Sequence, residues 1–185
     1  KSKYFAEEAL KTYKDAGKAN YVVLRLFNVC GADFSGELGD SRKPSQLLVQ
    51  NAVRGALGLQ KFNLVCGALP TRDGSAIRDY VDVNDVANAF FLANGYLSNG
   101  GDSETINIAS GNGVSVKEAV GKVEEVLGVQ LDVTNGEVRN GEVAEVFANI
   151  SKAKEILGWE PAVSLSESIK SNKTWYISHP NGFLN

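Results

Sequence analysis

Methionine is absent from this chain, and histidine and cysteine are scarce. The 185 residues include no Met, one His and two Cys. His179 stands alone, and Cys30 and Cys66 lie far apart without Cys-x-x-Cys spacing, so the sequence lacks the residue pattern of a metal site. We predict that the cysteines are buried apolar thiols in a reducing cytoplasm, and the alternative is a disulfide between them.

Long apolar runs and a strong charge of either sign are also missing. No run approaches the roughly 18 apolar residues that a membrane-spanning helix needs. The net charge is -3, so electrostatics do not attract the chain to nucleic acid. We therefore predict neither a membrane nor a nucleic-acid partner. A few well-placed arginines and backbone amides can still bind phosphate, which favours a small anionic ligand.

The sequence does contain an alternation of helix and strand signals. In the first predicted helix, Glu7 and Lys11 have the spacing of an i,i+4 ion pair, opposite an apolar stripe that begins at Phe5. The almost continuous apolar run 21–31 is typical of a strand covered on both faces of a parallel sheet. The alternation predicts the α/β class. The expected helices are 1–17, 45–56, 86–97, 116–128, 151–158 and 164–176, and the expected strands are 21–31, 62–66, 76–83, 105–110 and 131–138.

Polar residues predict several helix starts. Ser115 with Glu118, and Ser164 with Glu167, have the spacing of a capping box. Ser151 is expected to open the helix that ends at Gly158. For the helix 86–97, either Asn84 or Asp85 is expected to be the cap.

The first helix and strand have no earlier elements to pack against. A strand such as YVVLRLF needs sheet neighbours and helical cover, and the chain opens inside a predicted helix without a Met. We therefore expect an N-terminal half of the same protein to precede these residues.

Several short stretches occur in a family-specific order. They are SKYFAEE, LRLFNVCGAD, SGELGDS, PTRDGSAIRDYVDVNDVA, INIASGNGVSVKEAV, RNGEVAEVFANISKAKEILGWEP and HPNGF. Together they resemble the C-terminal half of the extended short-chain dehydrogenase/reductase family, most closely its UDP-hexose 4-epimerases. The resemblance implies a Rossmann-like NAD-binding domain ending with residues 1–35. Residues 36–185 are then mainly a small α/β nucleotide-sugar-binding domain, with segments around 75–110 returning to the Rossmann sheet.

The resemblance implies NAD as the cofactor. Lys3 takes the place of the lysine in the family's Tyr-x-x-x-Lys pair, which is catalytic and also binds the nicotinamide ribose. Leu26 stands where relatives commonly carry a tyrosine that contacts the nicotinamide. The tyrosine of the pair and the glycine-rich dinucleotide fingerprint are not in this sequence. Without the resemblance, Lys3 would be interpreted as a solvated lysine.

The resemblance also implies a clamp on the diphosphate of a UDP-sugar. Arg78 is expected to bind the phosphates with Tyr80 beside it, because the planar guanidinium donates parallel hydrogen bonds and keeps its charge. Arg139 is expected as the second arm of the clamp, and Glu142 as an acceptor for ribose hydroxyls. Without the resemblance, the two arginines would be interpreted as surface salt bridges with Asp79 and Glu142.

Further residues are expected around the same ligand. Asn28 follows a buried strand, where α/β sheets often place ligands, and is expected near the diphosphate. Gln46 and Leu47 lie at a helix start, where free amides suit anions. Val65 and Cys66 are expected to line the uracil slot.

The implied activity is the interconversion of UDP-glucose and UDP-galactose in galactose metabolism. It proceeds by C4 oxidation to a 4-keto sugar, rotation and re-reduction with NAD. The expected protein is a cytoplasmic enzyme whose isolated substrate-binding half is inactive, and a second copy in a homodimer is a candidate partner. Departures at Leu26, Gln46, Glu142 and Val146 leave the sugar open. The alternatives are a sister enzyme (UDP-N-acetylhexosamine or UDP-pentose 4-epimerase, UDP-glucuronate decarboxylase, dTDP-glucose 4,6-dehydratase) or a non-catalytic nucleotide-sugar-binding domain.

Overall fold

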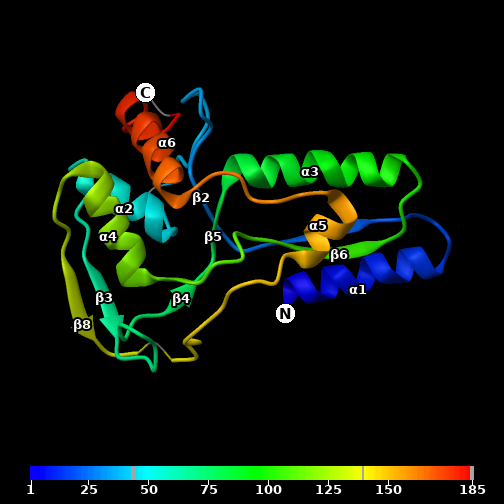
Figure 1. Ribbon diagram of the computed structural model, residues 1–185, viewed down its shortest axis with the longest axis horizontal. Helices are drawn as coiled ribbons and strands as arrows, with labels where there is room; N and C mark the ends of the chain where they lie inside the picture. The colour runs from blue at the N-terminus through cyan, green and yellow to red at the C-terminus, as the bar shows by residue number, and fades with distance from the viewer. Residues whose placement is uncertain (43–44, 139, 184–185) are drawn as a thin grey trace.

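The fold is built from short strand pairs surrounded by helices (Figure 1). The computed structural model describes residues 1–42, 45–138 and 140–183. This mixture of helix and strand confirms the predicted α/β class. The helices are α1 (Ser2–Asp15), α2 (Leu48–Ala56), α3 (Val83–Ser98), α4 (Val116–Leu127), α5 (Ser151–Leu157) and α6 (Leu165–Ser178). The strands are β1 (Val22–Leu26), β2 (Asn28–Cys30), β3 (Leu64–Gly67), β4 (Ile77–Arg78), β5 (Tyr80–Asp82), β6 (Glu104–Ile108), β7 (Val114–Ser115) and β8 (Val133–Gly136).

Parallel pairing dominates among these strands. β1 pairs with β6, β2 with β5, and β3 with β8, all in parallel, while β4 and β7 are antiparallel. In the β2–β5 pair, Asn28 lies opposite Tyr80. Residues from two segments distant in sequence therefore meet at this point.

Two of the predicted strands are each divided in two. The apolar run breaks at Phe27, whose N–H donates to the carbonyl of Ile108 (3.1 Å), and the next amide, of Asn28, donates to the carbonyl of Asp79 (2.9 Å). The chain thus passes from one strand pair to another. The strand predicted around Asp79 breaks there too, into β4 and β5, which pair with different partners. Predicting single strands was wrong because an apolar pattern does not specify partners.

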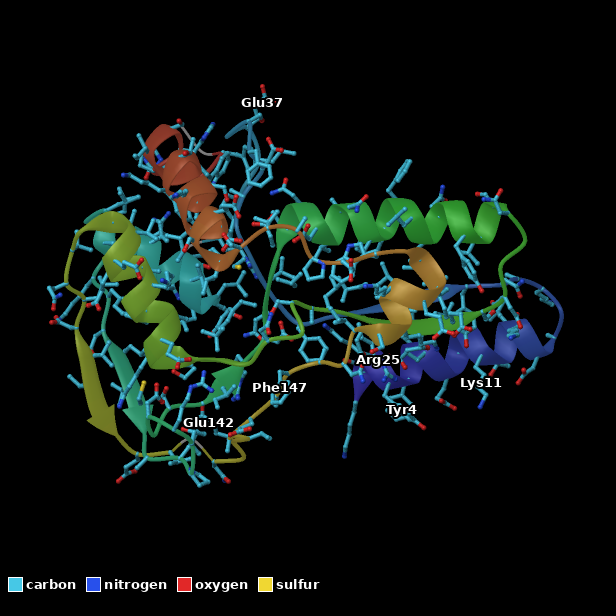
Figure 2. All side chains as sticks on the ribbon, in the orientation of Figure 1. Tyr4, Lys11, Arg25, Glu37, Glu142 and Phe147 are labelled. Carbon is cyan, nitrogen blue, oxygen red and sulfur yellow. The ribbon has the colours of Figure 1, made fainter. Side chains whose placement is uncertain are left out.

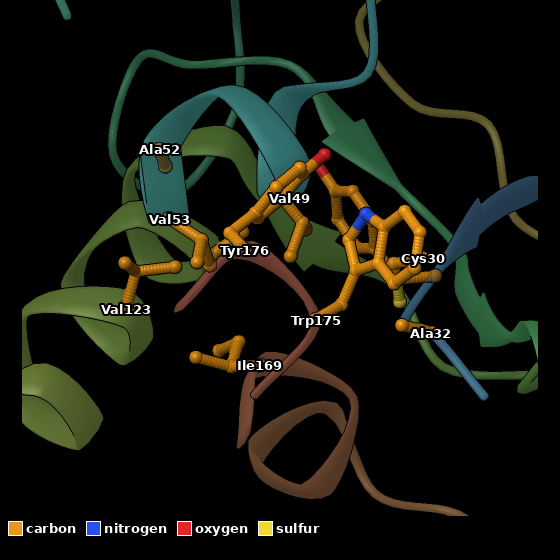
Figure 3. Close-up of a cluster of buried hydrophobic side chains, with 11 residues drawn as sticks. Cys30, Ala32, Val49, Ala52, Val53, Val123, Ile169, Trp175 and Tyr176 are labelled. Carbon is orange, nitrogen blue, oxygen red and sulfur yellow. The ribbon is translucent and has the colours of Figure 1, made fainter. Parts of the chain in front are cut away.

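Two groups of buried side chains form the core. One lies between α2, α4 and α6 and includes Ile169, Trp175 and Tyr176, all fully buried (Figure 3). The other lies around β1, β6, α3 and α5 and includes Trp159, whose indole N–H donates to the carbonyl of Asp85 (2.9 Å). In Figure 1 the helices around the two groups occupy opposite ends of the molecule.

Helix α1 forms as predicted, but its apolar stripe is not buried by any described residue. Phe5 is 65% exposed, and Figure 2 shows Tyr4 and Lys11 projecting from α1 away from the other elements. Glu7 pairs with Arg25 of β1 at 2.6 Å, so the predicted pair with Lys11 was wrong. Arg25 and the residue after it are also exposed, so β1 is not covered on both faces.

The predicted capping boxes both form. Ser115 with Glu118 opens α4, and Ser164 with Glu167 opens α6, each with reciprocal hydrogen bonds. Helix α5 begins at Ser151 as predicted and ends at a glycine in the left-handed conformation.

Two other helix starts differ from the prediction. Helix α3 is capped by Asp82, whose carboxylate accepts from the amide of Asn84 (2.7 Å), so neither Asn84 nor Asp85 is the cap. The reason is that the helix begins directly after β5, earlier than its apolar pattern indicated. Helix α2 begins at Leu48 rather than Ser45. None of the described helices combines the length and apolar composition required to cross a membrane.

Both cysteines are buried and neither forms a disulfide, as predicted. The alternative of a disulfide is therefore wrong. Burial raises the pKa of the Cys30 thiol to about 12, so this side chain stays neutral and packs as an apolar group.

Removing the two caps should have different effects on stability. Ser164→Ala removes an exposed cap and should lower the free energy of unfolding by about 1 kcal/mol. Ser115→Ala should lower it by about 2 kcal/mol, because Ser115 is fully buried and its hydroxyl also donates to Asp73. Urea unfolding of the two variants measures the difference, and equal losses would contradict the additional role of Ser115.

Candidate functional site

A cavity of about 520 Å³ lies where β2, β3, β4 and the start of α2 meet. Asn28 lines it from β2, and Gln46 and Leu47 line it just before α2. Val65 and Cys66 contribute from β3; Val65 is half exposed, whereas Cys66 is buried. Polar and apolar walls thus face the same space.

The remaining wall carries the charged residues. Arg78, Tyr80 and Glu142 also line the cavity. All the residues expected to contact the nucleotide sugar therefore line one cavity, except Arg139, which lies outside the described residues.

Backbone carbonyls and a carboxylate orient Arg78. Its Nη1 donates to the carbonyls of Ile77 (2.7 Å) and Val143 (2.9 Å). Its Nη2 lies 3.9 Å from Oε1 of Glu142, and the Arg78 side chain is 20% exposed. The interpretation of Arg78 as a salt bridge with Asp79 was wrong, because the Asp79 carboxylate accepts from Ser110 and other groups instead. The guanidinium is thus held in place at the cavity wall.

Tyr80 contributes a neutral phenol. Its side chain is 7% exposed, and burial raises its pKa, against the opposing effect of the Arg78 charge. A neutral hydroxyl can both donate and accept a hydrogen bond. Tyr80 is therefore suited to binding a ligand rather than to removing a proton.

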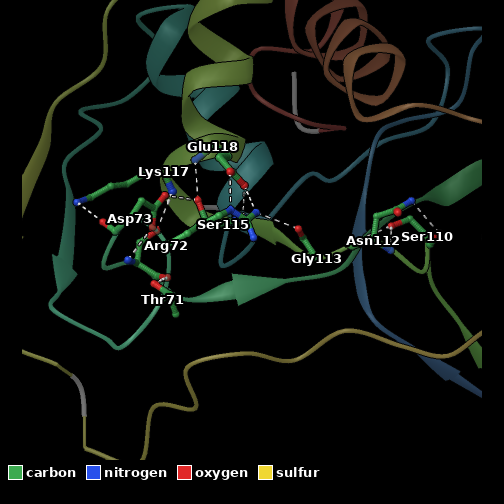
Figure 4. Close-up of polar contacts among 10 residues, drawn as sticks. Thr71, Arg72, Asp73, Ser110, Asn112, Gly113, Ser115, Lys117 and Glu118 are labelled. Carbon is green, nitrogen blue, oxygen red and sulfur yellow. Dashed lines mark hydrogen bonds and ion pairs between the residues drawn. The ribbon is translucent and has the colours of Figure 1, made fainter.

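Polar contacts tie the loop before β4 to the start of α4 (Figure 4). Asp73 accepts from the amide of Ser75 (2.8 Å) and from the hydroxyl of Ser115. Arg72 donates to both carboxylate oxygens of Glu118, with Nε 2.6 Å from Oε1. Because Ser75 lines the cavity, these contacts position one of its walls.

The structure also places residues in the wall that the sequence did not indicate. Asn51 of α2 and segment 60–63 line the cavity, as do Ser75 and Ala76. The PTRDG motif, which precedes RDY in the sequence, could have indicated Ser75 and Ala76, the two residues before β4. No comparable signal marks segment 60–63, because its place depends on side-chain contacts such as the hydrogen bonds that join Gln60 to Asn51 and Arg54 of α2.

The residues expected to contact NAD lie elsewhere. Lys3 is exposed on α1 and Leu26, at the end of β1, is 41% exposed. Neither lines the cavity. Lys3 and Leu26 are both exposed and do not enclose a pocket together. The described part of the chain therefore does not fit a dinucleotide by itself. Among all the residues that the structure describes, there is no cluster of acidic, His or Cys side chains that could hold a metal.

Parallel strand pairs with helices around them, and a cavity that combines an arginine, amides and apolar walls, define an α/β protein with a cavity of the size and composition typical of small-molecule sites. The family model described as GDP-mannose 4,6 dehydratase matches residues 1–172. The chain belongs to this family of extended short-chain dehydrogenases/reductases.

Named relatives agree with this membership. The UDP-glucose 4-epimerase of Rhizobium leguminosarum bv. trifolii is 40% identical over 95% of this chain and 54% of its own length. A crystal structure of a UDP-glucose 4-epimerase is 36% identical, with a TM-score of 0.90 over 97% of this chain and 55% of that one. The Bifidobacterium longum UDP-glucose 4-epimerase in complex with NAD+ and UDP is 30% identical, with a TM-score of 0.90 over 98% of this chain and 55% of that one. The chain spans about half the length of the curated relatives it matches.

The ion pair beside the cavity loop should be visible in an acid titration. Arg72, followed by the Ser115 amide, lowers the pKa of Glu118 from its usual 4.5 to about 2. A depressed folded-state pKa gives stability that is fully present above pH 4.5 and is lost as the pH falls towards 2. Arg72→Gln should therefore raise the Glu118 pKa, measured by NMR titration of its carboxyl carbon. Lys154→Gln, which breaks a separate surface pair with Glu160, should leave that pKa unchanged. An unchanged Glu118 pKa in Arg72→Gln would contradict the assigned cause.

Proposed function

We propose that this chain forms the nucleotide-sugar-binding part of a UDP-glucose 4-epimerase. The observation that carries the proposal is the convergence of Asn28, Leu47, Val65, Arg78 and Glu142 on one cavity. Its volume of about 520 Å³ falls within the range of roughly 300–1,000 Å³ typical of small-molecule sites.

In this proposal the cavity holds the UDP moiety. Arg78 binds the diphosphate because its guanidinium keeps its charge and presents several donors. Tyr80 and Asn28 add hydrogen bonds beside it. Val65 and Cys66 offer the apolar wall against which a flat uracil ring can pack.

The other assigned residues complete the nucleotide-sugar site. Gln46 and Leu47 bind at the start of α2, where main-chain amides suit an anion. Glu142 accepts from the ribose hydroxyls, and Arg139 is the second arm of the diphosphate clamp. Holding the nucleotide firmly leaves the sugar ring free to turn, which a 4-epimerisation requires.

The proposed reaction of the whole protein is the interconversion of UDP-glucose and UDP-galactose through a 4-keto sugar in galactose metabolism, with NAD as its cofactor. Lys3 is the proposed catalytic and ribose-binding lysine, and Leu26 lies at the nicotinamide.

Residues 1–35 are then the end of the NAD-binding domain and residues 36–185 mainly the substrate domain, with segments around 75–110 in the Rossmann sheet. Support for two domains comes from the two separate buried clusters, one around β1 and β6 and the other between α2, α4 and α6. The cluster around β1 and β6 also includes Ala153, Leu157 and Trp159, so the proposed Rossmann part extends to α5. The proposed partners are the UDP-sugar, an N-terminal half and a second copy, in the cytoplasm.

UDP binding tests the proposal directly. Arg78→Ala should weaken the affinity for UDP, measured by calorimetry, by about tenfold to a hundredfold, since a hydrogen bond to a charged group contributes about 1.5–3 kcal/mol. Arg78→Lys should lie in between, because it keeps the charge but loses the planar set of donors.

The matched control for this test is Arg25→Ala. Arg25 is an exposed arginine paired with Glu7, and it does not line the cavity. Its variant should bind UDP like the unmodified chain. Equal affinity of the Arg78→Ala variant and the unmodified chain would refute the proposed diphosphate contact.

Turnover separates the proposed function from its alternatives. The isolated chain should not convert UDP-galactose, because its sequence lacks the dinucleotide fingerprint and the catalytic tyrosine; conversion by this chain alone would contradict the proposal. A protein of the relatives' full length that contains this chain should convert UDP-galactose faster than UDP-N-acetylhexosamines, UDP-pentoses, UDP-glucuronate or dTDP-glucose. Preference for another of these substrates would identify a sister enzyme. UDP binding without any turnover would identify a binding domain.

A further inference from the structure

The residue between Arg78 and Tyr80 is a buried carboxylate with four donors. Asp79 is 0% exposed. Its Oδ1 accepts from the amide and the hydroxyl of Ser110, both at 2.7 Å. Its Oδ2 accepts from the amides of Gly111 (3.0 Å) and Ala148 (3.2 Å). A carboxylate is costly to bury unless hydrogen bonds replace its hydration, so this arrangement joins β4 firmly to two other segments.

The first segment is the turn after β6, in which Figure 4 labels Ser110 and Asn112. The second is the segment between β8 and α5, on which Figure 2 labels Glu142 and Phe147. This second segment runs alongside β4: the amide of Ile77 donates to the carbonyl of Ala144 (2.8 Å), and the amide of Val146 donates to the carbonyl of Ile77 (3.0 Å).

These contacts fix the partners of Arg78. The carbonyl of Val143, which accepts from Arg78 at 2.9 Å, and the carboxylate of Glu142, at 3.9 Å, both belong to the segment that Asp79 holds through Ala148.

The backbone of the same residue reaches a further wall of the cavity. The carbonyl of Asp79 accepts from the amide of Asn28 at 2.9 Å. Asp79 therefore connects Asn28, Arg78 and Glu142, which line the cavity from different parts of the sequence.

We propose that Asp79 is a positioning residue for nucleotide binding: its carboxylate holds the 142–148 segment against β4 and thereby aligns Arg78 and Glu142 in the cavity. Asp79 itself does not line the cavity. The inference rests on the proposed function for the identity of the ligand, and on the hydrogen bonds alone for the placement of the segment.

Asparagine cannot replace this carboxylate. All four groups that face Asp79 are donors. An amide offers one oxygen as acceptor, and its NH2 group would point at donors that need an acceptor. Asp79→Asn keeps the size of the side chain and removes about half of its hydrogen-bonding capacity, so it tests the contacts rather than the packing.

Asp85→Asn is the matched control. Asp85 is 5% exposed, and its Oδ2 accepts from the amides of Ala162 (3.1 Å) and Val163 (3.0 Å). It does not line the cavity. This variant therefore disturbs a buried carboxylate of the same kind without disturbing the 142–148 segment.

The experiment measures two quantities on the chain and both variants. Asp79→Asn should weaken UDP binding in calorimetry about tenfold or more and speed hydrogen exchange at the amides of Ile77, Val146 and Ala148. Asp85→Asn should leave both quantities unchanged under conditions where it remains folded.

Each outcome decides the inference. Unchanged exchange at these amides in Asp79→Asn, or equal weakening of UDP binding in both variants, overturns it. Failure of the unmodified chain to bind UDP would refute the proposed function and the nucleotide part of the inference, while hydrogen exchange would still decide the placement of the segment.

A milder variant applies where Asp79→Asn does not fold. Ser110→Ala removes the hydroxyl that donates to Asp79 and that also accepts from the amide of Asn112 (3.1 Å) within the same turn, and Ser110 does not line the cavity. It should weaken UDP binding about threefold and speed exchange at Ala148. No change in either quantity overturns the inference.

Discussion

The parallel pairing of β2 with β5 is the constraint on which the candidate site depends. It places Asn28 opposite Tyr80 and lets the Asn28 amide bond the carbonyl of Asp79 (2.9 Å). The chain enters this pairing only because β1 ends at Leu26 and the next residues change partners. The same short pairing thus sets where the cavity begins and how the two distant parts of the sequence share it. The β3–β8 pair then adds the apolar wall.

A chain of net charge -3 can still offer a local positive charge to a ligand. Arg78 is oriented by neutral carbonyl oxygens at 2.7 and 2.9 Å, while its carboxylate neighbour Glu142 stays at 3.9 Å. Carbonyl acceptors fix the position of a guanidinium without cancelling its charge. The negative charge nearest in sequence, on Asp79, is satisfied by other donors. The Arg78 guanidinium therefore keeps its positive charge at the cavity wall, because no carboxylate in the described part of the chain forms a close ion pair with it.

Local sequence signals predicted much of the fold correctly. Contacts between residues distant in the sequence were not predicted. The capping boxes at Ser115 and Ser164 formed because each needs only a few consecutive residues. The pair of Glu7 with Lys11 did not form, since Arg25 of the neighbouring strand offered two hydrogen bonds. For the candidate site, the quoted motifs contain four of the expected cavity residues, Asn28, Arg78, Tyr80 and Glu142. Only the family resemblance assigned them to one ligand, because the number of residues between two positions does not determine how far apart they lie in the folded protein.

By itself, the sequence determined the α/β class, the two capping boxes, the burial of both cysteines and the family to which the chain belongs. These depend on residue type and short-range order. The tertiary structure decided where the apolar run divides, which carboxylate faces four donors, and that segment 60–63 lines the cavity. Each of these depends on which distant backbone groups come within hydrogen-bond reach, and hydrophobic patterns leave that choice open until the strands have paired.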